Sequence, residues 1–264
     1  MDKRPIGLFD SGVGGLSVLR EIADLLPLEN FVYVADQKHV PYGGKSQTEL
    51  EKLTEQISRF LIGKQVKMIV IACNTATVYA LNHLRQKFTL PIVGVVPVVK
   101  TLAEKTKTGK TAVLATPATS KSSYLQALIQ KFAPEKTVYC IGGTGLEEVV
   151  ESGEVDSPEV ERRLKEFLTP LLEKDVDCLA LGCTHYPFLR EKIEDIVGDK
   201  MQVFDSGPAV ARQVKRILET NQILSNEKGE DFYFTSGETA KFKEVAEKLL
   251  QQEIKNIAQV AIKL

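Results

Sequence analysis

Short β-branched runs alternate with longer amphipathic stretches along most of this chain, and this alternation restricts the possible folds more than any other feature. Apolar runs such as 31–36 and 67–73 have the length of buried parallel strands. The stretches between them place apolar residues at helical spacing. We therefore predict an α/β fold with a mostly parallel sheet flanked by helices. In the first half, strands are expected at 5–10, 31–36, 67–73 and 91–96, and helices at 14–26, 48–63 and 75–88.

One of these helices carries a recognisable start signal. Thr48 is followed three residues later by Glu51, a pairing that is typical of a capping box. We therefore expect this helix to begin at Thr48.

The same layout returns in the second half, with strands expected at 111–116, 136–142, 176–183 and 201–207 and helices at 119–132, 157–173 and 186–197. Aligning the halves places Asp10 opposite Thr116, Ala35 opposite Ile141, Cys73 opposite Cys183 and Gly94 opposite Phe204. This repeat predicts two similar lobes, related by pseudo-twofold symmetry, with the active site between them.

The domain boundaries follow from the repeat. The first lobe is expected to comprise 1–97 and 208–264, and the second 98–207. The last segment is expected to be mostly helical with one strand at 231–237. It is too small to form a stable domain alone, so we expect it to pack on the first lobe.

Composition argues against several functional classes. The chain has 34 basic and 35 acidic residues in 264, so it lacks the basic excess of a nucleic-acid-binding protein. Its longest apolar runs, such as 68–72, are far shorter than a membrane span, and the first ten residues hold no secretory signal. We expect a cytoplasmic protein without a nucleic-acid or membrane partner.

Four cysteines are present, and neither a disulfide framework nor a metal site is expected from their pattern. Disulfides are uncommon in a chain of this size without a secretory signal. Cys178, Cys183 and His185 lie close in sequence, but their spacing matches no common structural zinc pattern.

Cys73 and Cys183 differ from the other two cysteines, Cys140 and Cys178, which fit the pattern of small buried hydrophobic residues. Each follows an apolar strand at the end where open α/β sheets bind ligands. Each precedes residues that can open a helix, whose amino terminus lowers a thiol pKa.

Two thiols at matching positions favour one kind of chemistry. Disulfide-exchange enzymes place their cysteines close together, and a thiol hydrolase needs one thiol and one base. A proton transfer that inverts a stereocentre needs an acid/base group on each face of the carbon, and thiols can be tuned for this role. We therefore predict a two-thiol proton transfer.

Polar residues near the thiols are candidates for binding a small substrate. The glycine-rich turn 9–15 is no dinucleotide fingerprint, because Ser17 stands where the last glycine would be. Its backbone N–H groups can still face a carboxylate, with Asp10 and Ser11 beside it. His185 is placed to control the proton of Cys183, whereas His39 and His83 receive no role.

At these residues the chain resembles the bacterial glutamate racemases, a family of cofactor-independent enzymes. The matching motifs are "FDSGVGG", "ADQKHVPYG", "ACNTAT", "ATPATS", "GCTHYP" and "FTSG", which extend from residue 9 to 237. The resemblance implies an isomerase that interconverts L- and D-glutamate without pyridoxal phosphate or any other cofactor. It also implies a role in peptidoglycan synthesis and cell-wall biogenesis, and a homodimer.

The resemblance assigns roles to individual residues. Cys73 would act on D-glutamate and Cys183 on L-glutamate, as acid/base catalysts. The assisting residues would be Asp10, Asp36, Glu151 and His185. The substrate-binding residues would be Asp10, Ser11, Tyr42, Gly43, Asn74, Thr75, Thr116, Thr119, Thr184 and His185. The segment Pro97–Lys100 departs from the acidic-Pro-Gly pattern that is frequent in the family.

Other functions stay open at this point. A related racemase for aspartate or another small amino acid would use the same two thiols. A pyridoxal-dependent racemase would show a lysine Schiff base, and a non-catalytic protein on a two-lobed scaffold would bind glutamate without exchanging its α-hydrogen. A redox role would appear as a reversible Cys73–Cys183 disulfide.

Overall fold

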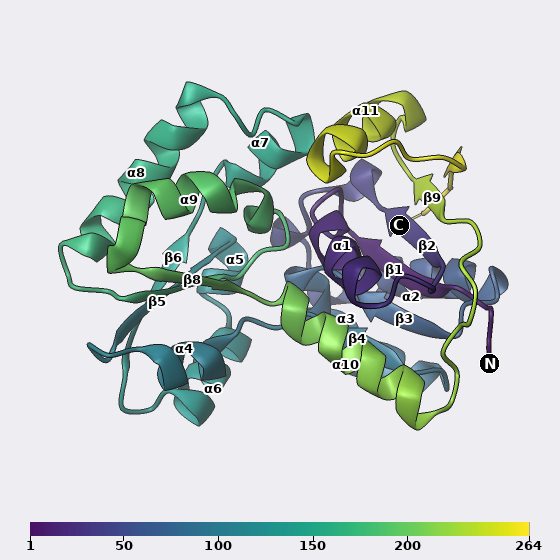
Figure 1. The fold of residues 1–264 in the computed structure, drawn as a ribbon, viewed down its shortest axis with the longest axis horizontal. Coiled ribbons are helices and arrows are strands. Elements are labelled where there is room, and N and C mark those ends of the chain that lie inside the picture. Colours follow the sequence, from purple (N-terminus) through teal and green to yellow (C-terminus); the bar gives the residue numbers. More distant parts are fainter. Residues whose placement is uncertain (264) are drawn as a thin grey trace. The chain divides into compact units, whose positions relative to one another are not determined.

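The computed structural model describes residues 1–263, which form two compact units (Figure 1). Of the described residues, unit 1 comprises 1–95 and 207–263, and unit 2 comprises 96–206. The boundaries expected from the sequence differ from these limits by one or two residues. Among the described residues, no helix is long and apolar enough to cross a membrane.

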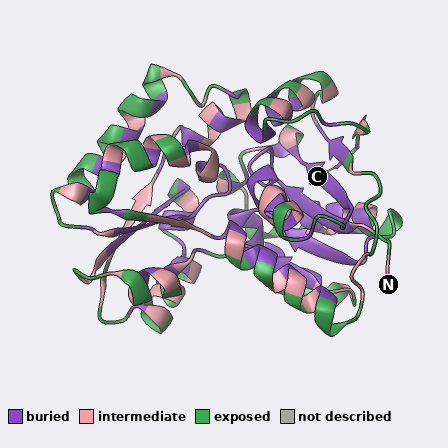
Figure 2. Cartoon of the chain, in the orientation of Figure 1, coloured by how far each residue is buried: buried purple, intermediate pink, exposed green. Residues whose placement is uncertain are grey.

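Unit 1 contains a six-stranded parallel sheet in the order β10-β9-β2-β1-β3-β4. Its strands are β1 (Ile6–Asp10), β2 (Phe31–Ala35), β3 (Met68–Ile71), β4 (Ile92–Gly94), β9 (Phe232–Thr235) and β10 (Ile257–Gln259). The central strands are buried on both faces, as their continuous apolar runs predict (Figure 2). Because β9 pairs with β2 and β10 with β9, the C-terminal segment adds two strands to the sheet of unit 1, although only the strand at 231–237 was expected.

Helices cover both faces of this sheet (Figure 1). They are α1 (Leu16–Leu25), α2 (Gln47–Gly63), α3 (Asn74–Lys87), α10 (Gly207–Thr220) and α11 (Thr239–Leu250), with 3-10 turns η1 (Gln37–His39) and η2 (Tyr42–Gly44). Helices α2 and α3 pack on the face that carries Phe9, Val34 and Ile71. On the other face, α1 packs against α10 and α11, and the ring of Tyr33 lies 6.3 Å from that of Phe242.

The start of α2 differs from the sequence-based expectation. Its N-cap is Ser46, whose hydroxyl accepts from the backbone N–H of Glu49, while the Glu49 carboxylate accepts from the backbone N–H of Ser46. The expected capping box of Thr48 and Glu51 is therefore wrong. Two overlapping patterns of the same kind are present, and Ser46 has the extended backbone that an N-cap requires.

Unit 2 contains a four-stranded parallel sheet in the order β6-β5-β7-β8. Its strands are β5 (Lys110–Ala115), β6 (Thr137–Gly142), β7 (Cys178–Leu181) and β8 (Gln202–Asp205). This order matches that of β2-β1-β3-β4 in unit 1. In each unit the first strand of the chain lies between the second and the third, and the fourth lies beside the third. The predicted α/β class, with two similar parallel sheets, is confirmed.

The helices of unit 2 also lie on both faces of its sheet (Figure 1). They are α4 (Val99–Lys105), α5 (Pro117–Ser120), α6 (Ser123–Phe132), α7 (Leu146–Ser152), α8 (Pro158–Leu172) and α9 (Arg190–Val197), with 3-10 turns η3 (Tyr186–Leu189) and η4 (Gly198–Lys200). The helix expected at 119–132 is divided, because Ser122 caps a new helix by accepting from the N–H of Leu125. The helix expected at 186–197 is a 3-10 turn followed by α9.

Candidate active site

The carboxyl edge of the sheet in unit 1 gathers four polar side chains. Asp10 ends β1, Asp36 follows β2, Ser236 follows β9, and Cys73 lies two residues after β3. The strand order β9-β2-β1-β3 therefore sets them out along one edge. All four are buried. This edge is where open parallel sheets bind ligands.

Cys73 is the N-cap of α3 and lies beside the turn after β1. Its Sγ is 3.9 Å from the Ser11 hydroxyl. The backbone N–H and hydroxyl of Ser11 both donate to Asp10 Oδ1, at 2.6 and 3.2 Å. Asn74 and Thr75 begin the helix and are also buried. The thiol thus lies at a helix amino terminus, where partial positive charge stabilises a thiolate.

The glycine-rich turn between β1 and α1 is closely packed against this group. A Cβ added to Gly15 would lie 2.8 Å from Asp10 Cβ and 2.9 Å from both Ala72 Cβ and the Tyr33 hydroxyl oxygen. Glycine is therefore required for the turn to approach β1 and β3 so closely. The Tyr33 hydroxyl also donates to the carbonyl of Gly12 at 2.7 Å, which holds the turn in place.

Asp36 is the acceptor of a buried hydrogen-bond network. Its carboxylate accepts from the hydroxyls of Tyr42 and Ser236, each at 2.7 Å, and lies 2.8 Å from His39 Nδ1. Burial, followed by the Asp36 charge, raises the pKa of Tyr42 well above its usual value, so this phenol remains a donor. His39, to which the sequence assigned no role, is therefore part of this network. Gly43 follows Tyr42 in η2.

The thiol of unit 2 has different partners. Cys183 lies two residues after β7, and its Sγ is 3.5 Å from His185 Nδ1 and 3.9 Å from Glu147 Oε1. The other ring nitrogen of His185, Nε2, lies 2.7 Å from Glu151 Oε1. Glu147 and Glu151 are four residues apart on α7, so both carboxylates project from one face of this helix.

These contacts set the protonation of the pair. Burial, followed by the Glu147 charge, raises the pKa of the Cys183 thiol to about 11. Burial lowers the pKa of His185, but its contacts with Cys183 and Glu151 outweigh this and hold the pKa well above its usual value. The sequence led us to expect a lowered thiol pKa at Cys183, but burial and the Glu147 charge raise it. The element that follows this thiol is the 3-10 turn η3 and not an α-helix.

The predicted threonines of unit 2 lie at the same edge of its sheet. Thr116 follows β5, the neighbour of β7, and its hydroxyl accepts from the backbone N–H of Thr119 at 3.1 Å. The same hydroxyl donates to Thr119 Oγ1 at 3.1 Å. Thr184 is buried beside Cys183. Both threonines of the "ATPATS" motif are therefore buried, and one caps α5.

The predicted site residues form one group at each carboxyl edge. The group in unit 1 is Asp10, Ser11, Asp36, Tyr42, Gly43, Cys73, Asn74 and Thr75, and that in unit 2 is Thr116, Thr119, Glu151, Cys183, Thr184 and His185. Sequence reasoning missed Glu147, because no helix was expected between 142 and 157. The signal was available: "LEEVVES" has apolar residues four apart and is flanked by Gly145 and Gly153.

One group of three side chains could hold a metal ion. The ligand atoms of Glu147, Cys183 and His185 all lie within 4.8 Å of one another. Sequence spacing does not indicate this cluster, since Glu147 is 36 residues from Cys183.

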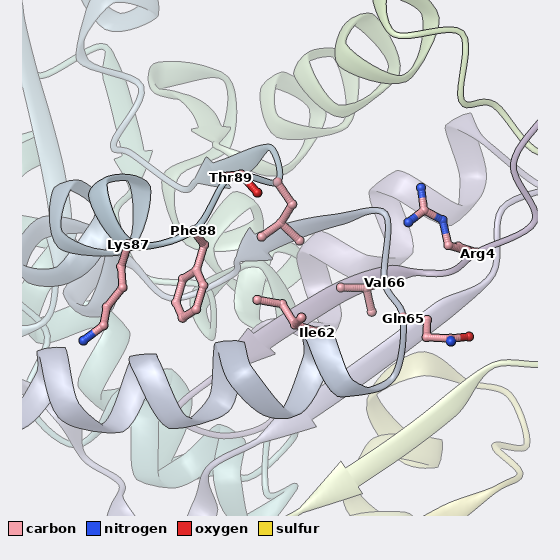
Figure 3. A pocket seen from close by; sticks show the side chains of 8 residues that line it. Arg4, Ile62, Gln65, Val66, Lys87, Phe88 and Thr89 are labelled. Carbon is pink, nitrogen blue, oxygen red and sulfur yellow. The ribbon is translucent and has the colours of Figure 1, made fainter.

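A separate pocket of about 580 Å³ lies in unit 1 away from these groups (Figure 3). It is lined by Arg4, Ile62, Gln65, Val66, Lys87, Phe88, Thr89 and Leu90, which precede β1, β3 and β4 and so lie at the amino edge of the sheet. Its two cations already have anionic partners, because Arg4 pairs with Asp2 and Lys87 with Glu55. None of the predicted site residues lines this pocket.

Comparison with known proteins identifies relatives over nearly the full length of the chain. The model of the Asp/Glu/hydantoin racemase family matches residues 14–214. A glutamate racemase from Herpetosiphon aurantiacus is 42% identical over 247 residues, which cover 93% of this chain and 97% of that protein.

Solved structures agree in fold. The crystal structure of glutamate racemase isoform RacE1 from Bacillus anthracis has a TM-score of 0.90 at 32% identity and covers 99% of both chains. The Escherichia coli glutamate racemase, crystallised with L-glutamate and the activator UDP-MurNAc-Ala, has a TM-score of 0.88 at 34% identity. That match covers 98% of this chain and 99% of the other.

Proposed function

Since this chain belongs to the Asp/Glu/hydantoin racemase family, we propose that it is a glutamate racemase that interconverts L- and D-glutamate by a two-thiol proton transfer. The observation that carries the proposal is the repeated placement of a thiol. Cys73 and Cys183 each lie two residues after the third strand of equivalent parallel sheets, at the edge where ligands bind.

In the proposed reaction, glutamate binds with one thiol against each face of its α-carbon. In the D-to-L direction, Cys73 as thiolate removes the α-proton and the Cys183 thiol delivers a proton to the opposite face. The reverse direction exchanges the two roles. The raised pKa of Cys183 is consistent with a resting thiol that is ready to donate.

Polar groups near each thiol would orient the substrate. The Ser11 hydroxyl and the amino terminus of α3 at Asn74 and Thr75 are suited to a carboxylate. Asp10 carries a buried negative charge that suits the α-ammonium group. Tyr42, Gly43, Thr116, Thr119 and Thr184 are assigned to substrate binding by the family resemblance.

Two carboxylates would assist the thiols through other residues. Glu151 holds His185 in the orientation that points Nδ1 at Cys183. When Cys183 gives up its proton, a protonated His185 would stabilise the thiolate that remains. Asp36 would position Tyr42 through their hydrogen bond in unit 1.

The biological setting follows from the family. D-glutamate made by this enzyme would supply peptidoglycan synthesis in the cytoplasm, and the protein would act as a homodimer without a cofactor. These assignments, like the two-domain boundaries at 97 and 208, are proposals. Aspartate is the alternative substrate, because the two thiols would serve it equally.

The test is α-hydrogen exchange in deuterated water, with the product resolved on a chiral column. The wild-type protein should racemise L-glutamate with uptake of deuterium and without added pyridoxal phosphate. Cys73→Ala and Cys183→Ala should each lower racemisation by about 10²–10⁴-fold, the usual contribution of a positioned acid or base. Cys140→Ala is the matched control and should retain activity, because Cys140 lies within β6.

Normal turnover by either Cys73→Ala or Cys183→Ala would refute the two-thiol mechanism. Exchange with aspartate in place of glutamate would instead change the substrate and leave the mechanism standing. Binding of glutamate without exchange would favour a non-catalytic protein.

A further inference from the structure

The thiol of unit 2 lies within a set of groups that matches the coordination chemistry of zinc. Cys183 Sγ, His185 Nδ1 and the Glu147 carboxylate offer one sulfur, one nitrogen and one oxygen, all within 4.8 Å of one another. Thiolate and imidazole favour borderline divalent ions such as zinc and cobalt over magnesium or calcium. Three protein ligands leave a fourth position for water, as in open zinc sites.

The two distances from the thiol sulfur match those between ligands of a tetrahedral ion. With Zn–S of about 2.3 Å and Zn–N or Zn–O of about 2.0 Å, ligand atoms are separated by about 3.5 Å. The observed distances from Cys183 Sγ are 3.5 Å to His185 Nδ1 and 3.9 Å to Glu147 Oε1. The two Sγ separations therefore need shifts of only a few tenths of an ångström. The ligand atoms of His185 and Glu147 are within 4.8 Å of each other, so the Glu147 carboxylate has to move about 1–1.5 Å towards the ring to complete the site.

The histidine is already oriented by a second carboxylate. Its Nε2 lies 2.7 Å from Glu151 Oε1, which leaves Nδ1 directed at the thiol. Metal-bound histidines almost always donate the N–H of the other ring nitrogen to a carboxylate, a backbone carbonyl or water. Because Glu147 and Glu151 are one turn apart on α7, a single helix supplies both a ligand and the residue that orients another ligand.

We propose that Glu147, Cys183 and His185 form a binding site for zinc or a similar borderline divalent cation, and that occupation of this site inhibits the enzyme. Binding converts the Cys183 thiol to a metal thiolate and the His185 imidazolium to a neutral metal-bound imidazole, and both protons are released to solvent. The bound sulfur can then neither donate nor accept the proton of the substrate. The inhibition rests on the proposed function, whereas the binding does not.

Cobalt titration of the reduced, chelator-treated full chain tests the binding. Co²⁺ should produce the near-ultraviolet thiolate-to-cobalt band and the visible bands of a tetrahedral site, and Zn²⁺ should displace it. Cys183→Ser should lose the near-ultraviolet band, and Glu147→Gln should weaken binding by about 10-fold or more. Glu151→Gln should weaken it by about 10–100-fold, the usual effect of removing such a partner.

Two controls separate this site from other thiols and carboxylates. Glu148→Gln changes the exposed neighbour of Glu147 on the same helix and should leave the titration unchanged. Cys73→Ser removes the thiol of unit 1 and should also retain the cobalt band. Circular dichroism of each variant establishes that it is folded.

The outcomes test the metal site and the proposed racemase function separately. Racemisation that zinc inhibits, and that a chelator restores, supports both. Cobalt binding that requires Cys183, in a protein without racemase activity, leaves the metal site standing and refutes the function. Absence of the band at millimolar Co²⁺, a band that survives Cys183→Ser, or a band that Cys73→Ser abolishes would overturn the site.

Discussion

Replacement of Lys67 by Met should strongly destabilise unit 1, because it breaks an ion pair that is closed to solvent. Lys67 Nζ lies 2.5 Å from Glu29 Oε2, and the two side chains are 0% and 1% exposed. The same Nζ donates to the backbone carbonyls of Asp2 and Ile223, at 2.9 and 2.8 Å. Lys67 thus joins the start of β3 to the amino-terminal segment and to the connection after α10.

The size of the effect follows from the charge that remains. Without Lys67, the buried Glu29 carboxylate keeps the backbone N–H of Ser225, which donates to Oε1 at 2.8 Å, but Oε2 loses its cation. Removing one member of a buried pair usually costs about 3–5 kcal/mol in the free energy of unfolding. With a urea m-value of about 1–3 kcal/mol per molar, such a loss lowers the unfolding midpoint by more than about 1 M.

The chain offers a control in an exposed ion pair of unit 1, which joins the amino-terminal segment to the connection after α10. Lys3 Nζ lies 2.7 Å from Glu227 Oε1, but the side chains are 61% and 60% exposed. Lys3→Met should therefore cost less than about 1 kcal/mol. The double variant Lys67→Met with Glu29→Gln should recover much of the loss, because it removes the buried charge and keeps an acceptor for Ser225.

Urea unfolding followed by far-ultraviolet circular dichroism measures these three variants together with Glu29→Gln alone. Equal costs for Lys67→Met and Lys3→Met would refute the argument from burial. The argument would also be refuted if the double variant lost as much free energy of unfolding as the two single variants together, because the two side chains would then not interact.

Three further effects are expected. Tyr42→Phe removes a hydrogen bond to the buried Asp36 carboxylate and should cost about 1.5–3 kcal/mol in urea unfolding. Gly15→Ala places a Cβ 2.8 Å from Asp10 Cβ. It should lower the free energy of unfolding by about 1–3 kcal/mol, seen as a lower thermal midpoint, and it should also slow racemisation. Burial, followed by the charge of Asp231, raises the pKa of Tyr233 from 10.0 to about 12. The contribution of protonated Tyr233 to the free energy of unfolding is fully present below pH 10.0. About 2–3 kcal/mol of it is lost as the pH rises towards about 12. Urea unfolding at about pH 9 and about pH 11 measures this effect. Between these pH values, the free energy of unfolding should fall less for Tyr233→Phe than for the wild type.

The sequence predicts the sheets well because their strands have a strong and simple signal. Apolar runs that are buried on both faces identify β1, β3, β5 and β7, and polar residues at their ends or one to two residues later mark the carboxyl edges. The equivalence of Cys73 and Cys183 follows from this regularity alone. The regularity is sufficient to place each thiol correctly relative to its own sheet.

Helix ends are less well determined, because several residues in a row can serve as caps. Ser46 and Thr48 are each followed by a glutamate three residues later, and the conformation of Ser46 decides between them. In the segment 116–125, Thr116 and Ser122 both act as caps, so one expected helix becomes two. Local patterns cannot rank such alternatives, since the choice depends on tertiary packing.

The two thiols differ in what surrounds them, and this difference suggests how a symmetric reaction can be run by an asymmetric site. Cys73 has a serine hydroxyl and a helix amino terminus beside it, whereas Cys183 has an imidazole and a carboxylate. Both sets can stabilise a thiolate, one through neutral donors and helix charge and the other through a cationic ring. Only the second set contains metal ligands in addition to the thiol. Sensitivity to zinc should therefore reside in unit 2 alone, although both thiols are expected to perform the same chemistry.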